Sequence, residues 1–183
     1  MFTGMREGEI LGLQWDCVDF DTGTINIRRQ LQKEKKKGGV HYLSDPKNSK
    51  PRTIKPARAI MQLLQRRRAQ QCANRLRAGK LWDNPWNLVF TNETGRHLIA
   101  GTVYKDFKRK AAEIGLPDAR FHDLRYSYAV AALQAGDDVK TVQGNLGHHT
   151  AAFTLDVYGH ITEKMKQQSA DRMEAFIESI SNL

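Results

Sequence analysis

The segment from His122 to His160 gathers histidine, arginine and tyrosine side chains within fewer than forty residues. His122 and Arg125 are three residues apart, so they share a face if this segment is helical. His148 follows a Leu-Gly turn, where a side chain can project from a helix end, and Tyr158 comes ten residues later. An arginine fork binds phosphate oxygens in pairs, a histidine donates further hydrogen bonds, and a phenol can take over a phosphoryl group. These residue types favour a phosphate site with a tyrosine nucleophile.

Other interpretations of these residues stay open at this point. They would form a poor metal site, because no carboxylate or thiolate is placed with them. A tyrosine near a helix end is usually a packing residue with a satisfied hydroxyl, and a single histidine usually belongs to the surface or the core. Taken singly, each residue is therefore more often structural than catalytic.

Positive charge is concentrated in the first 80 residues. This part has 18 Lys/Arg against 7 Asp/Glu, a net charge of +11, whereas the remaining residues have 11 against 13, a net charge of −2. A cationic surface of this kind favours a polyanion, most often nucleic acid. The alternative is a solvated surface with an excess of lysine, and the uneven distribution favours nucleic acid over it.

Length and composition predict a folded domain. The chain has 183 residues, of which 40% are hydrophobic, and this suits one domain with a real core. It has no apolar run near the roughly 18 residues that a membrane span needs, and its start does not have the pattern of a signal peptide. Cys17 and Cys72 lie far apart, which favours a reduced, cytosolic compartment. We expect a cytoplasmic protein with no membrane partner.

The elements that must position these residues are mostly helical. Helical spacing and cap residues predict helices over 4–13 and 57–77, around Val103 to Ile114, from Phe121 to Gly136, after Asp137 or Asp138, and over 162–180. Alternating Ile25 and Ile27 predict a strand, and two further short strands should flank the Pro-rich turn at 45–51. The predicted class is α+β, mainly α-helical, with one small antiparallel sheet that carries much of the positive charge.

Four segments of the chain resemble the successive motifs of the tyrosine recombinase (phage integrase) family. They are "TGMREGEILGLQWDCVDF", "DPKNSKPRTI", "HDLRYSYA" and "LGHHTAAFTLDVYGH". They occur in the order typical of the family and span nearly the whole chain. The amino-acid sequences of the last two motifs are most similar to those of the integrases of conjugative transposons. One departure is Tyr126, where the family usually has a histidine or a similar residue. The resemblance implies the catalytic fold of this family and a bacterial, nucleoid-associated protein.

The resemblance also implies roles for individual residues. Arg6 and Arg125 would clamp the scissile phosphate, His122 and His148 would donate hydrogen bonds to it, and Tyr158 would be the nucleophile. His122 is also a candidate acceptor for the phenol proton. The remaining implied site residues are Lys47 as the general acid, with Lys50 as the alternative, and Glu9 as a support for the first motif. We expect contacts to the DNA backbone from Arg28, Arg29, Lys50 and Arg52.

The implied reaction is a transesterification. Tyr158 would attack a phosphate of duplex DNA to form a 3′-phosphotyrosine, and a 5′-hydroxyl from another strand would then reseal it. The resemblance implies no cofactor, metal or ATP. It implies a single catalytic domain over 1–183, the C-terminal domain of a longer integrase whose N-terminal core-binding and arm-binding domains are absent. Expected partners are double-stranded DNA and further copies of the protein, in a synaptic tetramer of the full-length protein. The C-terminal helix would either be exchanged between protomers or pack on its own domain.

Three other functions remain as alternatives. A non-catalytic DNA-binding or regulatory module on the same fold would use the same charge. Within the family, a resolvase or a topoisomerase IB-like enzyme is also compatible with these motifs. A nuclease that uses the histidines and a metal would lose its activity in chelator, whereas the recombinase would not.

Overall fold

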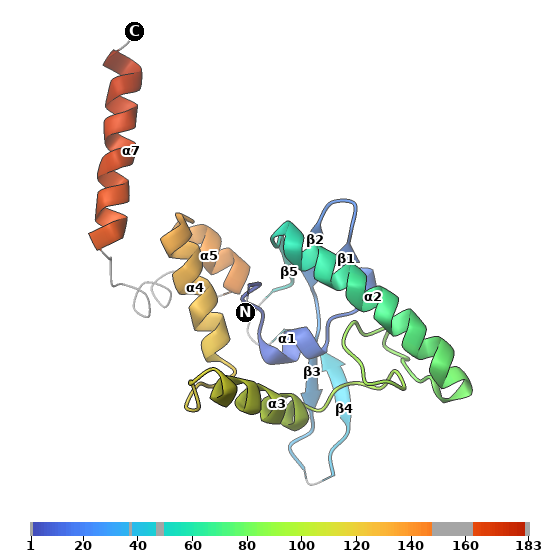
Figure 1. Ribbon diagram of the computed structural model, residues 1–183. Coiled ribbons are helices and arrows are strands. Elements are labelled where there is room, and N and C mark those ends of the chain that lie inside the picture. Colours follow the sequence, from blue (N-terminus) through green and yellow to red (C-terminus); the bar gives the residue numbers. More distant parts are fainter. Residues whose placement is uncertain (1, 37, 47–49, 148–162, 182–183) are drawn as a thin grey trace.

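A computed structural model of the chain describes residues 2–36, 38–46, 50–147 and 163–181 (Figure 1). The first helix, α1 (Glu7–Leu11), is shorter than predicted. Gly4 has φ +61°, a left-handed conformation that interrupts a right-handed helix, so the helix begins only after Arg6. The Arg6 backbone N–H donates to the Glu9 carboxylate at 2.8 Å, which satisfies one of the N–H groups at the start of the helix.

The strands form two antiparallel sheets, and the prediction of a single sheet was wrong. The three-stranded sheet has the order β1 (Val18–Asp19), β2 (Thr24–Ile27), β5 (Arg52–Ile54), and the second sheet is the hairpin of β3 (Gln30–Lys33) and β4 (His41–Ser44). The two strands that flank the Pro-rich turn, β4 and β5, therefore pair with different partners. Ile25 lies opposite Ile54 in the larger sheet, and both side chains are buried. This cross-strand pair sets the register of β2 and β5.

The main core lies between the three-stranded sheet and the long helix α2 (Arg58–Ala78), which crosses it in Figure 1. Met61 and Leu64 of α2 pack with Ile25 and Ile27 of β2 and with Val89. The short 3₁₀ helix η1 (Trp15–Cys17) contributes Cys17 to this core, and a second one, η2 (Gly79–Leu81), follows α2. The predicted helix over 57–77 is confirmed to within one residue at each end.

A second, smaller core joins α4 (Asp123–Ala135) to α5 (Val139–Leu146). Gly136, with φ +102°, ends α4, and the Asp138 side chain accepts hydrogen bonds from two backbone N–H groups at the start of α5. Both features agree with the predicted helix end and helix start, and Asp138 rather than Asp137 is the N-cap of α5. This tight α4–α5 turn brings the end of α5 back to the N-terminal segment.

Two further helices complete the described part of the chain. Helix α3 (Ala100–Glu113) precedes α4, and α7 (Glu163–Ser181) stands apart from the other helices in Figure 1. The predicted class, α+β with a predominance of helix, is confirmed. Within the part of the chain that the structure describes, none of the helices could span a lipid bilayer.

Candidate active site

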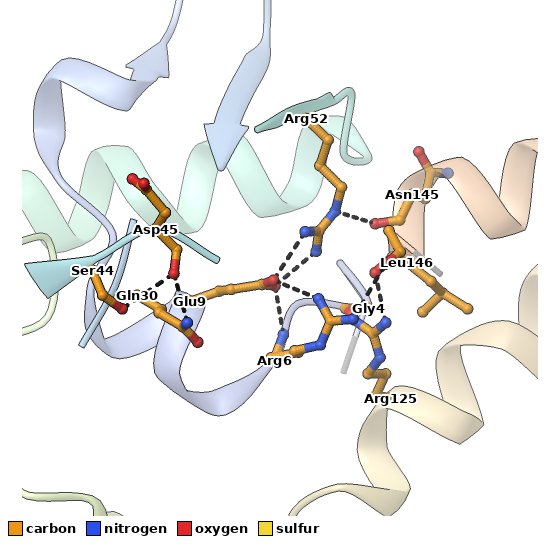
Figure 2. A network of polar contacts seen from close by, with 11 residues as sticks. Gly4, Arg6, Glu9, Gln30, Ser44, Asp45, Arg52, Arg125, Asn145 and Leu146 are labelled. Carbon is orange, nitrogen blue, oxygen red and sulfur yellow. Dashed lines mark hydrogen bonds and ion pairs between the residues drawn. The ribbon is translucent and has the colours of Figure 1, made fainter. Parts of the chain in front are cut away.

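A buried carboxylate organises the junction of α1, β5 and the end of α5 (Figure 2). Glu9 is fully buried, and its two oxygens accept hydrogen bonds from Arg6 and Arg52. Burial alone would raise the pKa of Glu9, but the hydrogen bonds and charge of Arg52, with the hydrogen bonds from Arg6, outweigh it and lower the pKa. Glu9 is therefore an ionised anchor that holds two guanidinium groups in place.

Arg6 is held on both sides by this junction. Its Nη1 lies 2.8 Å from Glu9 Oε1, and its Nη2 donates to the Gly147 carbonyl at 3.2 Å. The Arg6 side chain retains 28% of its exposure, so it is both fixed by the protein and open to solvent. A guanidinium group in this setting can contact an anion without first losing rotamer freedom.

Arg125 projects from the first turn of α4 into the same junction. Its Nη1 donates to the Gly4 carbonyl and its Nη2 to the Leu146 carbonyl, both at 2.5 Å, and the residue is 4% exposed. Arg6 and Arg125 therefore converge on the consecutive carbonyl groups of Leu146 and Gly147, where α5 ends. The Glu9 carboxylate is bonded by Arg6 and Arg52, whereas Arg125 donates to uncharged backbone carbonyls.

His122 lies one residue before α4, next to Arg125 in space. Its pKa is lowered first by burial and then by the charge of Arg125, with smaller contributions from Arg120 and Arg6. Its ring meets the edge of Tyr126 at a centroid distance of 5.0 Å. A lowered pKa keeps this imidazole neutral at physiological pH, so it can accept a proton.

These side chains line a common hollow of ≈ 80 Å³, to which Arg6, His122 and Arg125 all contribute. The hollow has room for more than one water, since a water occupies about 30 Å³ of liquid. The structure therefore brings together three of the six predicted catalytic residues. Their chemistry, two cations and a neutral imidazole, suits a phosphate group.

Glu7 also lines this hollow, and the sequence interpretation missed it. Its Oε1 is buried without a hydrogen-bond partner, and burial raises the pKa of this carboxyl group. In sequence, Glu7 cannot be distinguished from an acidic residue that favours a helix start. Arg52 was predicted only as a DNA contact, and its role as the partner of Glu9 was missed because this contact joins residues that lie far apart in the chain.

Three predicted catalytic residues, Lys47, His148 and Tyr158, lie outside the described residues. The chain leads directly from Gly147, whose carbonyl contacts Arg6, into His148. Lys50, the alternative to Lys47, is exposed ahead of β5.

The predicted DNA-contacting arginines all have protein partners. Arg28 bonds Asp16 at 2.8 Å and the Cys17 sulfur at 3.1 Å, and Arg29 pairs with Asp45 at 2.8 Å. Arg28 and Arg29 are nevertheless exposed, whereas the Arg52 side chain is 9% exposed and forks onto Glu9. Contacts of these residues with DNA stay a prediction. The geometry also gives Arg52 a structural role, because it holds the Glu9 carboxylate.

Comparison with known proteins agrees with the motif pattern. The sequence pattern of the Phage integrase family matches residues 1–165. The chain is 29% identical over 181 residues to a protein named tyrosine recombinase XerC-like from Caldanaerobacter subterraneus subsp. tengcongensis, covering 93% of this chain and 46% of that protein. It is 27% identical over 187 residues to the ICEBs1 integrase of Bacillus subtilis, with 94% and 46% covered. The chain thus spans about half the length of the curated relatives that it matches.

Solved structures show the same fold. The Tn1549 transposon integrase in complex with a circular intermediate DNA matches with a TM-score of 0.74 and 25% identity, covering 93% of this chain and 55% of that one. The XerA recombinase matches with a TM-score of 0.68 and 20% identity, covering 94% of this chain and 54% of that one.

Proposed function

Because the chain belongs to the phage integrase family, we propose that it is the catalytic domain of a tyrosine site-specific recombinase that cleaves and rejoins duplex DNA. The observation that carries this proposal is the convergence of Arg6, Arg125 and His122 on one hollow beside Gly147. The chain enters the "LGHH" motif at this point, and Tyr158 follows ten residues after His148. The chain covers about half of its relatives, so we propose that it is the catalytic part of a longer integrase.

Arg6 and Arg125 perform electrostatic catalysis in this proposal. Both guanidinium groups contact the non-bridging oxygens of the scissile phosphate, on which charge grows as the nucleophile approaches. Glu9, held by Arg52, keeps Arg6 oriented but does not touch the phosphate. His148 donates a further hydrogen bond to the same oxygens.

The chemical step exchanges one phosphodiester bond for another. The Tyr158 oxygen attacks the phosphorus in line, the bond from phosphorus to the 5′ oxygen breaks, and a 3′-phosphotyrosine forms. The proton of the phenol passes to neutral His122, and the departing 5′ oxygen takes a proton from Lys47. A 5′-hydroxyl of another strand reverses these steps, so the ester conserves the bond energy and neither ATP nor metal is consumed.

Duplex DNA and further copies of the protein are the proposed partners. The DNA backbone lies against the basic first 80 residues, with contacts from Arg28, Arg29, Lys50 and Arg52. The full-length protein assembles as a tetramer on two DNA sites. Helix α7 presents the exposed apolar side chains Met173, Phe176, Ile177 and Ile180, and we place this face on a neighbouring protomer. The site of action is the bacterial nucleoid, in the cytoplasm.

A covalent trapping experiment tests the function. The 183-residue chain is incubated at low salt with a nicked suicide duplex, and a denaturing gel detects the protein–DNA adduct. We expect an adduct that resists chelator and disappears in Tyr158→Phe, with unchanged DNA binding. Tyr126→Phe and Tyr128→Phe are matched controls that retain the adduct. Binding of DNA without any adduct would instead support a non-catalytic module, and loss of the adduct in chelator would support metal-dependent chemistry.

A further inference from the structure

A second cleft lies on the flank of α2. Its walls are formed by Trp15, by Arg68, Cys72 and Arg75 of α2, and by Trp82 of the following loop. Its volume, ≈ 390 Å³, falls within the range of small-molecule sites, about 300–1,000 Å³. It shares no lining residue with the hollow at Arg6 and His122.

The floor of this tryptophan–arginine cleft is rigid and internally satisfied. The Gln71 side chain accepts from Trp15 Nε1 at 2.6 Å and donates to the Leu88 carbonyl at 3.0 Å. Asn84 both accepts from the Leu88 backbone N–H and donates to its carbonyl. These bonds hold the Trp15 ring and the loop in place without a ligand, so the cleft is preorganised.

The walls, in contrast, hold positive charge that the protein does not neutralise. Among the described residues, neither Arg68 nor Arg75 has a carboxylate partner. Arg68 lies over the Trp15 and Phe20 rings at 5.8 Å from each centroid, a cation–π arrangement that positions its guanidinium group. Helix α2 contains six arginines and no acidic residue, so its field favours an anion.

The spacing of these groups suits one particular class of anion. Arg68 and Arg75 are seven residues apart, two turns of helix or about 10.5 Å along its axis, and both face the cleft. Two guanidinium groups bind phosphate oxygens, and indole rings offer flat faces on which a nucleobase stacks. An acidic peptide would use the arginines but would leave the indoles without a planar partner.

We propose that the tryptophan–arginine cleft binds a nucleoside phosphate, either as a free nucleotide or as one unit of single-stranded nucleic acid. The phosphate lies between Arg68 and Arg75, and the base stacks on an indole of the cleft. This site is additional to the proposed phosphate clamp at Arg6 and Arg125, and it does not depend on catalysis.

Cys72 provides a local readout of occupancy. It is exposed in the cleft, whereas Cys17 is buried, so a maleimide reagent should modify Cys72 first. The experiment measures the alkylation rate of Cys72 by mass spectrometry with dAMP, with a short single-stranded oligonucleotide, with duplex DNA and with a polyglutamate peptide. We expect at least one nucleotide probe to slow alkylation by about tenfold, corresponding to roughly 90% occupancy. Protection by dAMP identifies a free-nucleotide site, and protection by the oligonucleotide alone identifies a strand site.

Two exposed arginines of the same helix supply the matched variants. Arg75→Gln removes a wall of the cleft and should abolish the protection, whereas Arg66→Gln, an exposed arginine that does not line the cleft, should retain it. Both variants should still form the Tyr158 adduct, which separates this proposal from the proposed function. The proposal is overturned by unchanged Cys72 alkylation with both nucleotide probes, by equal protection from polyglutamate, or by equal loss of protection in the two variants.

Discussion

Arg52 of β5 holds both carboxylate oxygens of Glu9 of α1, with Nη1 2.9 Å from Oε1 and Nη2 2.7 Å from Oε2. The Glu9 side chain is fully buried and the Arg52 side chain is nearly so. Arg52 Nε also donates to the Asn145 carbonyl at the end of α5. One ion pair therefore links α1, which begins directly after Arg6, to the sheet and to the turn that precedes His148. The geometry of the proposed phosphate clamp depends on this link.

Glu9→Gln should destabilise the fold strongly. The substitution leaves the buried Arg52 without its carboxylate, and loss of one partner of a buried pair costs about 3–5 kcal/mol. Urea unfolding followed by circular dichroism measures the change in the free energy of unfolding. Glu93→Gln, at an exposed glutamate, is the control and should change stability by less than about 0.5 kcal/mol. Similar effects of the two substitutions would contradict a structural role for the Glu9–Arg52 pair.

Glu7 and Glu9 should give opposite pH dependences of stability, although they lie on the same helix. The pKa of Glu7 is raised above 4.5 by burial, so its contribution to stability is present at lower pH and is lost as pH rises through the raised pKa. The pKa of Glu9 is lowered, so its contribution is present above 4.5 and is lost as pH falls through the lowered pKa. Glu7→Gln should therefore stabilise the chain at neutral pH.

Urea titrations at a series of pH values measure this difference. The advantage of Glu7→Gln over the parent chain should shrink as pH falls toward the ordinary pKa of glutamate, 4.5. On acidification, the free energy of unfolding should fall less in Glu9→Gln than in the parent chain. A Glu7→Gln chain that is less stable than the parent at neutral pH would show that the carboxylate has a favourable partner.

His122 should determine the acid limb of DNA cleavage. Its pKa is lowered from 6.5, first by burial and then by Arg125, so the imidazole is neutral and able to accept the Tyr158 proton above that value. The rate of adduct formation should be level above pH 6.5 and should fall by about tenfold per pH unit below the lowered pKa.

The matched comparison for this pH profile is His122→Gln against His41→Gln. His41 also has a lowered pKa, caused by burial, His97 and Lys33, but it lies on β4 and does not line the hollow. His122→Gln should slow cleavage at neutral pH and remove the acid inflection, whereas His41→Gln should retain the parent profile. An unchanged inflection in His122→Gln would assign the proton to another group.

Gly147→Ala should destabilise the end of α5. Gly147 has φ +64°, a left-handed conformation that costs an L-residue about 1–2 kcal/mol. A Cβ there would also lie 2.9 Å from Arg52 Nη1, so the side chain that holds Glu9 must shift. The free energy of unfolding and the rate of adduct formation should both fall. Gly144→Ala is the control: it lies within the same helix with open space around its Cβ position, and it should stabilise the chain by about 0.5–1 kcal/mol.

Features that depend on neighbouring residues could be predicted from the sequence alone. Hydrophobic spacing located α2, Gly136 with Asp137 or Asp138 marked the turn between α4 and α5, and the alternating Ile25 and Ile27 marked β2. Each of these features arises from local backbone preference combined with one buried face, and both can be read from a short window. The four family motifs, which are also local strings, were sufficient to identify the family.

The folded chain was needed to show which distant groups share an environment. The sequence pattern did not indicate that Arg52 neutralises Glu9, that Arg125 bonds the Gly4 and Leu146 carbonyls, or that β4 and β5 belong to different sheets. Glu7 and Glu9 look equivalent in the sequence, yet Glu7 is only partly buried, with no hydrogen-bond partner at its buried Oε1, and Glu9 is fully buried and accepts hydrogen bonds from two arginines. The physical reason is that burial, charge pairing and strand pairing depend on distances in space, and chain folding sets those distances between residues far apart in sequence.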